Sequence, residues 1–340
     1  MGIEDTGAKR RLSVNLPWNP DFVETFLRRA RLADEIGVDT ICVIEGYGHD
    51  AFTGLALLAR ETQRVRLASA IVNVFSRTPG ALAQSFGTVD QLSAGRVVIG
   101  LGASAPGAIE RFHGVRFERP FARLRETVEL IRLYWSRRRF DYDGPTIHVE
   151  RSLVSGVVPA QQTPPIHLAS LHPRSVRLTA ELADGWMPTW IPNDRTAASV
   201  AELRGWAEGY GREPSAIEVR SPGTALVVAD SQRLDSVERG FAQGLAFFAV
   251  RNGPGYFHQF ERQGFGPEVE AMRDAWATGG SGAAAEIALE ISDRFSVRAD
   301  LESCAAHLDA QAAVGVDLHQ VSVDTEDDQN WADALARLVG

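Results

Sequence analysis

Residues 33–45 of the chain, ADEIGVDTICVIE, join the end of a helical segment, a glycine and an apolar run. The helical part follows Asn19-Pro20, and its apolar residues recur at helical spacing: Phe22, Phe26, Ala30, Ala33 and Ile36. We expect Gly37 to end this helix and Thr40 to Glu45 to form a strand. The same order, written QAAVGVD, recurs at residues 311–317 before another apolar run. This repeated arrangement predicts an α/β protein.

Short apolar runs alternate with longer amphipathic segments along the chain, as in βα units around a parallel sheet. Several runs are almost continuously apolar, which is typical of strands covered on both faces. Eight runs can be counted: Leu12 to Leu16, Thr40 to Glu45, Val65 to Val72, Val97 to Leu101, Pro165 to Ser170, Gly185 to Trp190, Thr224 to Ala229 and Leu318 to Val323. Eight strands predict a (β/α)8 TIM barrel, and we expect residues 1–340 to form a single domain.

Two stretches depart from this alternation. At about residues 140–157, the turn Asp143-Gly144-Pro145 lies between β-rich arms and predicts an inserted hairpin. Residues 231–298 have a helical pattern broken by glycines. A separate helical domain is one interpretation of this stretch, but too few of its residues form an independent apolar set. We therefore expect a helical insertion packed on the barrel between its last two strands.

Composition excludes several classes of protein. The formal net charge is −9, and the only basic clusters are Lys9-Arg10-Arg11 and Arg137-Arg138-Arg139, so a nucleic-acid partner is not expected. No run approaches the roughly 18 apolar residues of a membrane span, and the charged N-terminus lacks a signal-like apolar segment. Cys42 lies in an apolar run and is expected to be buried and inert. A cytoplasmic enzyme, acting as a homodimer on a small-molecule substrate, is the default expectation.

Missing motifs narrow the chemistry further. The chain has no H-E-x-x-H sequence and no paired cysteines, so no metal site is expected. It has no G-x-S-x-G sequence for a serine nucleophile. Lys9 is the only lysine and precedes the first strand, which excludes Schiff-base chemistry in the barrel.

Active sites of this architecture lie at the C-terminal ends of the strands. The second run is followed by Glu45, Tyr47 and His49, which bring a carboxylate, a phenol and an imidazole to the barrel mouth. Glu45 could instead pair with a neighbouring arginine, but we favour a site role because an acid directly at a strand end has little other reason to be there. After the third run, Arg77 is expected to be structural, and Ser76 or Thr78 to cap a helix.

Two further strand ends suggest a cofactor. Residues 100–107, GLGASAPG, lack the spacing of a dinucleotide-binding loop, but their small side chains would let a planar ring approach the backbone. Residues 169–175, ASLHPRS, open a helix whose N-terminus, with Arg174 beside it, could hold a phosphate. Ordinary capping by Ser175 is the alternative interpretation.

Taken in order, these motifs resemble the bacterial luciferase-like monooxygenase superfamily, in particular its branch that uses the 5-deazaflavin coenzyme F420. The similarity covers nearly the whole chain. Its most specific parts are IEGYG at 44–48, SRTP at 76–79, DQLSAGR at 90–96 with GLGAS at 100–104, HGV at 113–115, RP at 119–120, RLRE at 123–126 and ADGW at 183–186.

The resemblance implies a deazaflavin stacked over the barrel mouth, with a non-prolyl cis peptide bond that should join Ala70 and Ile71. It also implies that the cofactor tail lies near the loops after the fourth and fifth strands. The expected cofactor contacts are Ala70, Ile71, Asn73, Gly102, Ala103, Ser104, Ser170, His172, Arg174 and Ser175.

The chain departs from this pattern at the catalytic positions. Many deazaflavin relatives carry Asp-His where this chain has Glu45-Gly46, and the sugar-phosphate dehydrogenases have a further acid near the position of Ala105, which argues against glucose 6-phosphate as substrate. Glu45, Tyr47, His49 and His113 remain candidates for proton transfer, with Glu45 preferred because burial beneath the ring would make it a general acid. The expected function is F420-dependent hydride transfer to or from a small organic substrate. The alternatives are a reduced-FMN-dependent monooxygenase and a non-catalytic flavin-binding protein.

Overall fold

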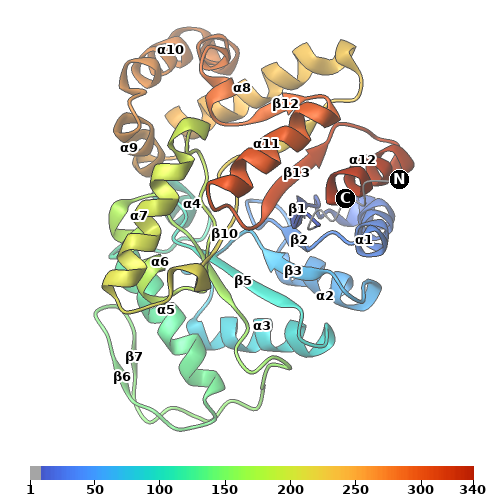
Figure 1. Ribbon diagram of the computed structural model, residues 1–340. Helices are drawn as coiled ribbons and strands as arrows, with labels where there is room; N and C mark the ends of the chain where they lie inside the picture. Colours follow the sequence, from blue (N-terminus) through green and yellow to red (C-terminus); the bar gives the residue numbers. More distant parts are fainter. Residues whose placement is uncertain (1–8) are drawn as a thin grey trace.

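The computed structural model describes residues 9–340, in which eight parallel strands form a closed barrel (Figure 1). The barrel strands are β1 (Leu12–Asn15), β2 (Thr40–Val43), β3 (Arg66–Ser69), β5 (Val97–Gly102), β8 (Ile166–Ala169), β9 (Gly185–Trp186), β10 (Glu218–Val219) and β13 (His319–Val323). β1 pairs with both β2 and β13. Closure between β10 and β13 is made by a bridge between Arg220 and Leu318 and by hydrogen bonds to Val219 O from the backbone N of Asp317 (2.8 Å) and Leu318 (3.1 Å). The predicted barrel is confirmed.

The seventh strand differs from its prediction. The expected run at 224–229 forms β11 (Ala225–Val227), but β10 precedes it and occupies the place beside β9. β11 continues along β13 and pairs on its other side with β12 (Val297–Ala299). Sequence reasoning missed β10 because Glu218 and Arg220 point into the barrel, so the segment lacks the continuous apolar run expected of a buried strand.

Helices cover the outside of the barrel (Figure 1). They are α1 (Val23–Ile36), α2 (Ala51–Glu61), α3 (Pro79–Leu92), α5 (Pro120–Trp135), α6 (Pro173–Leu182), α7 (Thr196–Gly209), α11 (Leu301–Ala313) and α12 (Asp328–Val339), with the short α4 (Pro106–Arg111) after β5. Gly37 ends α1 with a φ of +86°, a conformation that glycine adopts without a Cβ clash. Thr78, one of the two predicted caps, accepts a hydrogen bond from the N–H of Ala81 at the start of α3.

Alternation along each strand sends successive side chains to opposite faces of the barrel wall. The outward residues Ile41, Leu67 and Ile99 belong to the main apolar core, which lies between the strands and the surrounding helices. The inward residues are smaller or polar, and Cys42 joins a small apolar cluster there. Its thiol is fully buried, as predicted.

The two stretches that depart from the βα alternation, residues 140–157 and 231–298, contain a hairpin and a group of helices, respectively. β6 (Tyr142–Asp143) and β7 (His148–Val149) pair antiparallel as a hairpin, and β4 (Val72–Asn73) pairs with β5. Residues 231–298 supply α8 (Leu234–Val250), α9 (Pro254–Arg262) and α10 (Gly266–Leu289), which lie together at one side of the molecule (Figure 1). No helix in the described part of the chain has the length and apolar character of a membrane span.

These three helices bury more apolar surface among themselves than the sequence suggested. Their cluster includes Leu245, Phe260 and Met272, each fully buried. Trp190, which follows β9, contacts rings of this segment, with centroids 5.2 Å from Phe248 and 6.0 Å from Phe260. The expectation that too few residues form an independent apolar set was therefore wrong, because the alanine-rich faces of α8 and α10 pack closely around these larger side chains.

Candidate active site at the barrel mouth

The C-terminal ends of the parallel strands form one mouth, and the loop after β3 lies across it. The peptide bond between Ala70 and Ile71 is cis, as predicted. A Cβ atom at position 102 would lie 3.0 Å from Cδ1 of Ile71 and 3.4 Å from Cβ of Ala169, so Gly102 is needed for this close packing. The result is a surface of small and apolar groups that suits the flat face of a planar ring.

Asn73 connects this surface to His113. Its Oδ1 accepts hydrogen bonds from the backbone N of Phe75 (3.0 Å) and Ser76 (2.8 Å). Because both of these groups are donors, the amide orientation is fixed and Nδ2 must point to Nε2 of His113, 3.2 Å away. Asn73 is therefore a positioning residue for His113 as well as a predicted cofactor contact.

The tautomer of His113 follows from this contact. Nδ2 of Asn73 can only donate, so Nε2 of His113 accepts and the ring proton lies on Nδ1. No described residue accepts a hydrogen bond from Nδ1. The imidazole thus presents an N–H donor beside the loop that holds Ile71, and β4 pairs Asn73 with Gly102 across the ladder.

Glu45 forms the ion pair that was considered as its alternative role. Nη1 and Nη2 of Arg77 donate to its two carboxylate oxygens at 2.6 and 3.0 Å, and the backbone N of Ala51 donates at 2.9 Å. The Glu45 side chain is only 7% exposed. Both oxygens accept hydrogen bonds, so Arg77 and the start of α2 hold the carboxylate in place. The arrangement in turn fixes Arg77 and the first turn of α2.

Tyr47 and His49 leave the same loop in different directions. Tyr47 is exposed, and its ring contacts Phe112 edge to face at 5.6 Å between centroids. His49 contacts Trp18 at 6.1 Å, on the side of β1, and does not line the mouth pocket described below. Of the four predicted proton-transfer residues, Tyr47 and His113 both contact Phe112, since the rings of Phe112 and His113 lie 5.0 Å apart.

At the fifth strand end, the predicted residues begin α6. The cap is His172, whose Nδ1 accepts from the N–H of Arg174 at 3.1 Å, and not Ser175 as in the alternative interpretation. Ser175 donates its hydroxyl to His172 O (2.8 Å), and the Ser170 hydroxyl lies 2.8 Å from that of Thr179. Both hydroxyls therefore face α6 rather than the mouth.

Positive charge gathers around His172. Partial burial and the nearby charges of Arg262, Arg174 and His258 lower the pKa of its imidazole. Arg174 is exposed and forms no ion pair among residues 9–340. Arg262 and His258 come from α9, a segment with no sequence signal for a site. The start of α6 is thus a place where an anionic group would be stabilised.

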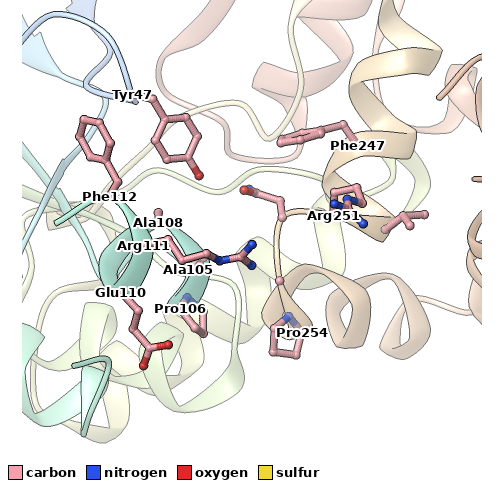
Figure 2. A pocket seen from close by; sticks show the side chains of 14 residues that line it. Tyr47, Ala105, Pro106, Ala108, Glu110, Arg111, Phe112, Phe247, Arg251 and Pro254 are labelled. Carbon is pink, nitrogen blue, oxygen red and sulfur yellow. The ribbon is translucent and has the colours of Figure 1, made fainter. Parts of the chain in front are cut away.

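A pocket of about 620 Å³ opens at the mouth between α4 and the junction of α8 with α9 (Figure 2). Tyr47, Arg111 and Phe112 line one wall, and Phe247 and Arg251 line the other. Figure 2 shows the Arg111 side chain extending from α4 toward the opposite wall. Sequence reasoning did not place this pocket, because half of it comes from the inserted helices.

Below the mouth, Arg220 lies inside the barrel. It is 6% exposed, and it donates from Nε to Oγ of Ser13 (3.2 Å) and from Nη2 to Oδ1 of Asn15 (2.9 Å). A buried guanidinium that is held by neutral acceptors keeps its positive charge uncompensated by direct contact. Sequence reasoning did not single out Arg220, because β10, which directly precedes it, was not identified.

Comparison with known proteins places this site in a family. The sequence profile of the luciferase-like monooxygenase family matches residues 13–318, and the chain belongs to this family. It is an oxidoreductase enzyme, as predicted.

Individual relatives are consistent with this placement. The chain is 31% identical over 310 residues to a protein of Mycobacterium tuberculosis that is provisionally named a coenzyme F420-dependent oxidoreductase, with 85% of this chain and 88% of that protein covered. It is 24% identical over 294 residues to the 5,10-methylenetetrahydromethanopterin reductase of Methanolobus tindarius, with 84% and 86% covered. Among solved structures, the coenzyme F420-dependent tetrahydromethanopterin reductase of Methanopyrus kandleri superposes with a TM-score of 0.79 at 20% identity, covering 97% and 98% of the two chains.

Proposed function

We propose that the chain binds coenzyme F420 at the barrel mouth and catalyses hydride transfer between the deazaflavin and a small organic substrate. The observation that carries the proposal is the combination of a flat surface at Ile71 and Gly102 with a positively charged region at the start of α6. A planar ring with an anionic tail fits both features. The similarity to relatives named for F420 supports this choice over FMN.

Different residues of this chain would hold the ring and the tail of the cofactor. Ala70, Ile71 and Gly102 support the ring, while Arg174 and Arg262 stabilise the tail by charge. The deazaflavin, when bound, supplies a hydride acceptor or donor.

Hydride delivery to an unsaturated bond leaves a second atom that needs a proton. We propose that the Tyr47 hydroxyl supplies this proton, because Glu45 is held by Arg77. The Nδ1–H of His113, a neutral imidazole whose Nε2 accepts from Asn73, would donate a hydrogen bond to the negative charge that develops on the substrate.

Binding of the purified chain to oxidised F420 and to FMN, followed by fluorescence titration, tests the proposal. We expect F420 to bind more tightly and the bound, reduced cofactor to be reoxidised by an organic acceptor without consumption of oxygen. Tighter binding of FMN with oxygen consumption would favour the monooxygenase alternative. Binding of neither cofactor would contradict the proposed function.

A further inference from the structure

We propose that the pocket between α4 and the junction of α8 with α9 binds the anionic group of the substrate, a carboxylate or a phosphate, between Arg111 and Arg251. The proposal rests on the proposed function, because it names the substrate class of the same mouth. It defines the substrate as an organic acid with an apolar or aromatic body.

The charge of the pocket supports an anionic ligand. Arg111 and Arg251 line opposite walls, and neither forms an ion pair or a hydrogen bond with any side chain of residues 9–340. Glu110 is the only acid in the lining, and its Oε1 accepts from the backbone N of Phe117 at 3.3 Å. Figure 2 shows its carboxylate directed away from the two guanidinium groups. The pocket therefore holds two positive charges that no acid of the lining neutralises.

The absence of a side chain at Gly107 leaves room for the Arg111 guanidinium. A Cβ atom at position 107 would lie 3.1 Å from Nη2 of Arg111, so the guanidinium lies over Gly107 on the same helix. A side chain at position 107 would require the guanidinium to shift by a few tenths of an ångström. Two guanidinium groups that converge on one cavity are the arrangement that binds carboxylates and phosphates with paired hydrogen bonds.

The remaining lining indicates the body of the ligand. Tyr47, Phe112 and Phe247 are 59%, 54% and 40% exposed, and all three line this pocket. Solvent-exposed aromatic side chains that gather in one concave site mark a binding surface for an apolar group. His113 does not line the pocket, but its ring contacts that of Phe112, which does, at 5.0 Å between centroids.

The cofactor tail has a different seat. The charges of Arg174 and Arg262 act on His172 at the start of α6, and neither arginine lines the pocket. α9 contributes to both places, with Pro254 at its first turn in the pocket and Arg262 at its last turn near α6. This separation assigns the tail to α6 and the substrate anion to Arg111 and Arg251.

The test uses naphthalene-2-carboxylate and its neutral carboxamide as probes, titrated into the full chain by calorimetry in a buffer without phosphate. We expect the carboxylate to bind about 10-fold to 100-fold more tightly than the carboxamide, the size of a charge-assisted contact. Arg111→Gln and Arg251→Gln should each reduce this preference to less than about threefold. Arg116→Gln is the matched control, because Arg116 is an exposed arginine of the next loop, and it should keep the preference. An equal affinity for both probes, or a preference that survives both pocket variants, would overturn the proposal.

A second titration separates the substrate from the cofactor. F420 and the deazaflavin nucleoside without its phosphate-linked tail are bound to the wild type and to Arg111→Gln. Unchanged binding of both supports the substrate assignment, whereas selective loss of F420 affinity would assign the pocket to the tail and overturn it. If the wild type binds the carboxylate through Arg111 and Arg251 but does not bind F420, the anion pocket stands and the proposed function fails.

Discussion

Both ends of the barrel carry charged side chains, but their pairing differs. At the N-terminal end, Asp39 accepts hydrogen bonds from Arg11 (2.7 Å) and from Nε of Arg66 (2.8 Å), and Arg66 also reaches Glu218 at 3.1 Å. At the mouth, Arg111 and Arg251 have no acidic partner among residues 9–340. Charges that satisfy one another stabilise the fold, whereas charges left without partners are available to a ligand.

Burial explains why the N-terminal network must be complete. Burial of Asp39 opposes its ionisation, but Arg11 and Arg66 outweigh this and hold the pKa of its carboxyl below the ordinary value. Burial lowers the pKa of His167 to about 4, so this imidazole is neutral at pH 7. Removal of the Asp39 charge would leave Glu218 as the one carboxylate that pairs with Arg11 and Arg66 in the described part of the chain. We therefore expect changes at this end to alter stability, and changes at the mouth to alter function.

The largest expected effect is on stability. Asp39→Asn removes one of the two carboxylates that pair with Arg11 and Arg66 and should lower the free energy of unfolding by about 1.5–3 kcal/mol. Chemical denaturation measures it. Asp309→Asn, which breaks an exposed pair with Arg10, should cost less than about 1 kcal/mol. Equal losses for the two variants would show that the N-terminal network is no more important than a surface pair.

At the mouth, His113→Gln should lower turnover by roughly 10²- to 10³-fold, the size of the loss of one hydrogen-bond donor to a developing negative charge, while the free energy of unfolding changes by less than about 1 kcal/mol. Turnover is followed with reduced F420 and an acceptor found by screening unsaturated and carbonyl acids. Glu45→Gln is the comparison, because it removes the carboxylate that holds Arg77 and should lower stability as well. If His113→Gln keeps full turnover and Glu45→Gln loses it without a loss of stability, the proton belongs to Glu45.

Substitution at the proposed binding site of the cofactor tail should have a smaller effect, which is on the affinity for F420. Arg174→Ala removes a charge at the start of α6 and should weaken F420 binding by about 1.5–3 kcal/mol. Thermal unfolding without cofactor should not change, because Arg174 is exposed and unpaired among the described residues. Arg177→Ala, on the same helix but packed on Trp206, is the control for affinity. An unchanged dissociation constant for Arg174→Ala would place the tail elsewhere.

The pH dependence of stability should come from the N-terminal end. The folded-state pKa of His167 is about 4 and its ordinary value is 6.5, so the unfolded chain binds the proton first as the pH falls. Its contribution is fully present above pH 6.5 and declines toward pH 4, with a loss of about 2 kcal/mol between pH 7 and pH 5. His167→Gln should remove this part of the pH dependence, and replacement of the exposed His148 should not. An identical pH dependence in wild type and His167→Gln would contradict the assignment.

The sequence predicted the barrel well because its signal is local. The apolar runs at Thr40 to Glu45 and Val97 to Leu101 appear as β2 and β5, and the helix predicted to end at Gly37 does so. Each of these depends on side-chain alternation or on one residue's backbone preference, which neighbours in sequence determine. β10 was missed because charged side chains at Glu218 and Arg220 hide a strand that only the barrel interior makes stable.

The candidate site also has features that the sequence predicts and features that depend on tertiary contacts. From sequence alone, Ala70 and Ile71, Gly102 and the start of α6 could be placed at the mouth, because parallel strands bring their C-terminal ends to one place. Three features depend on groups that are 32, 40 and 140 residues apart in the chain: the pairing of Glu45 with Arg77, the tautomer of His113 set by Asn73, and the presence of Arg111 and Arg251 in one pocket. Such contacts leave no periodic trace in a single sequence. Tertiary packing therefore decided which of the candidate groups holds a charge, which carries a proton and which is left free for a ligand.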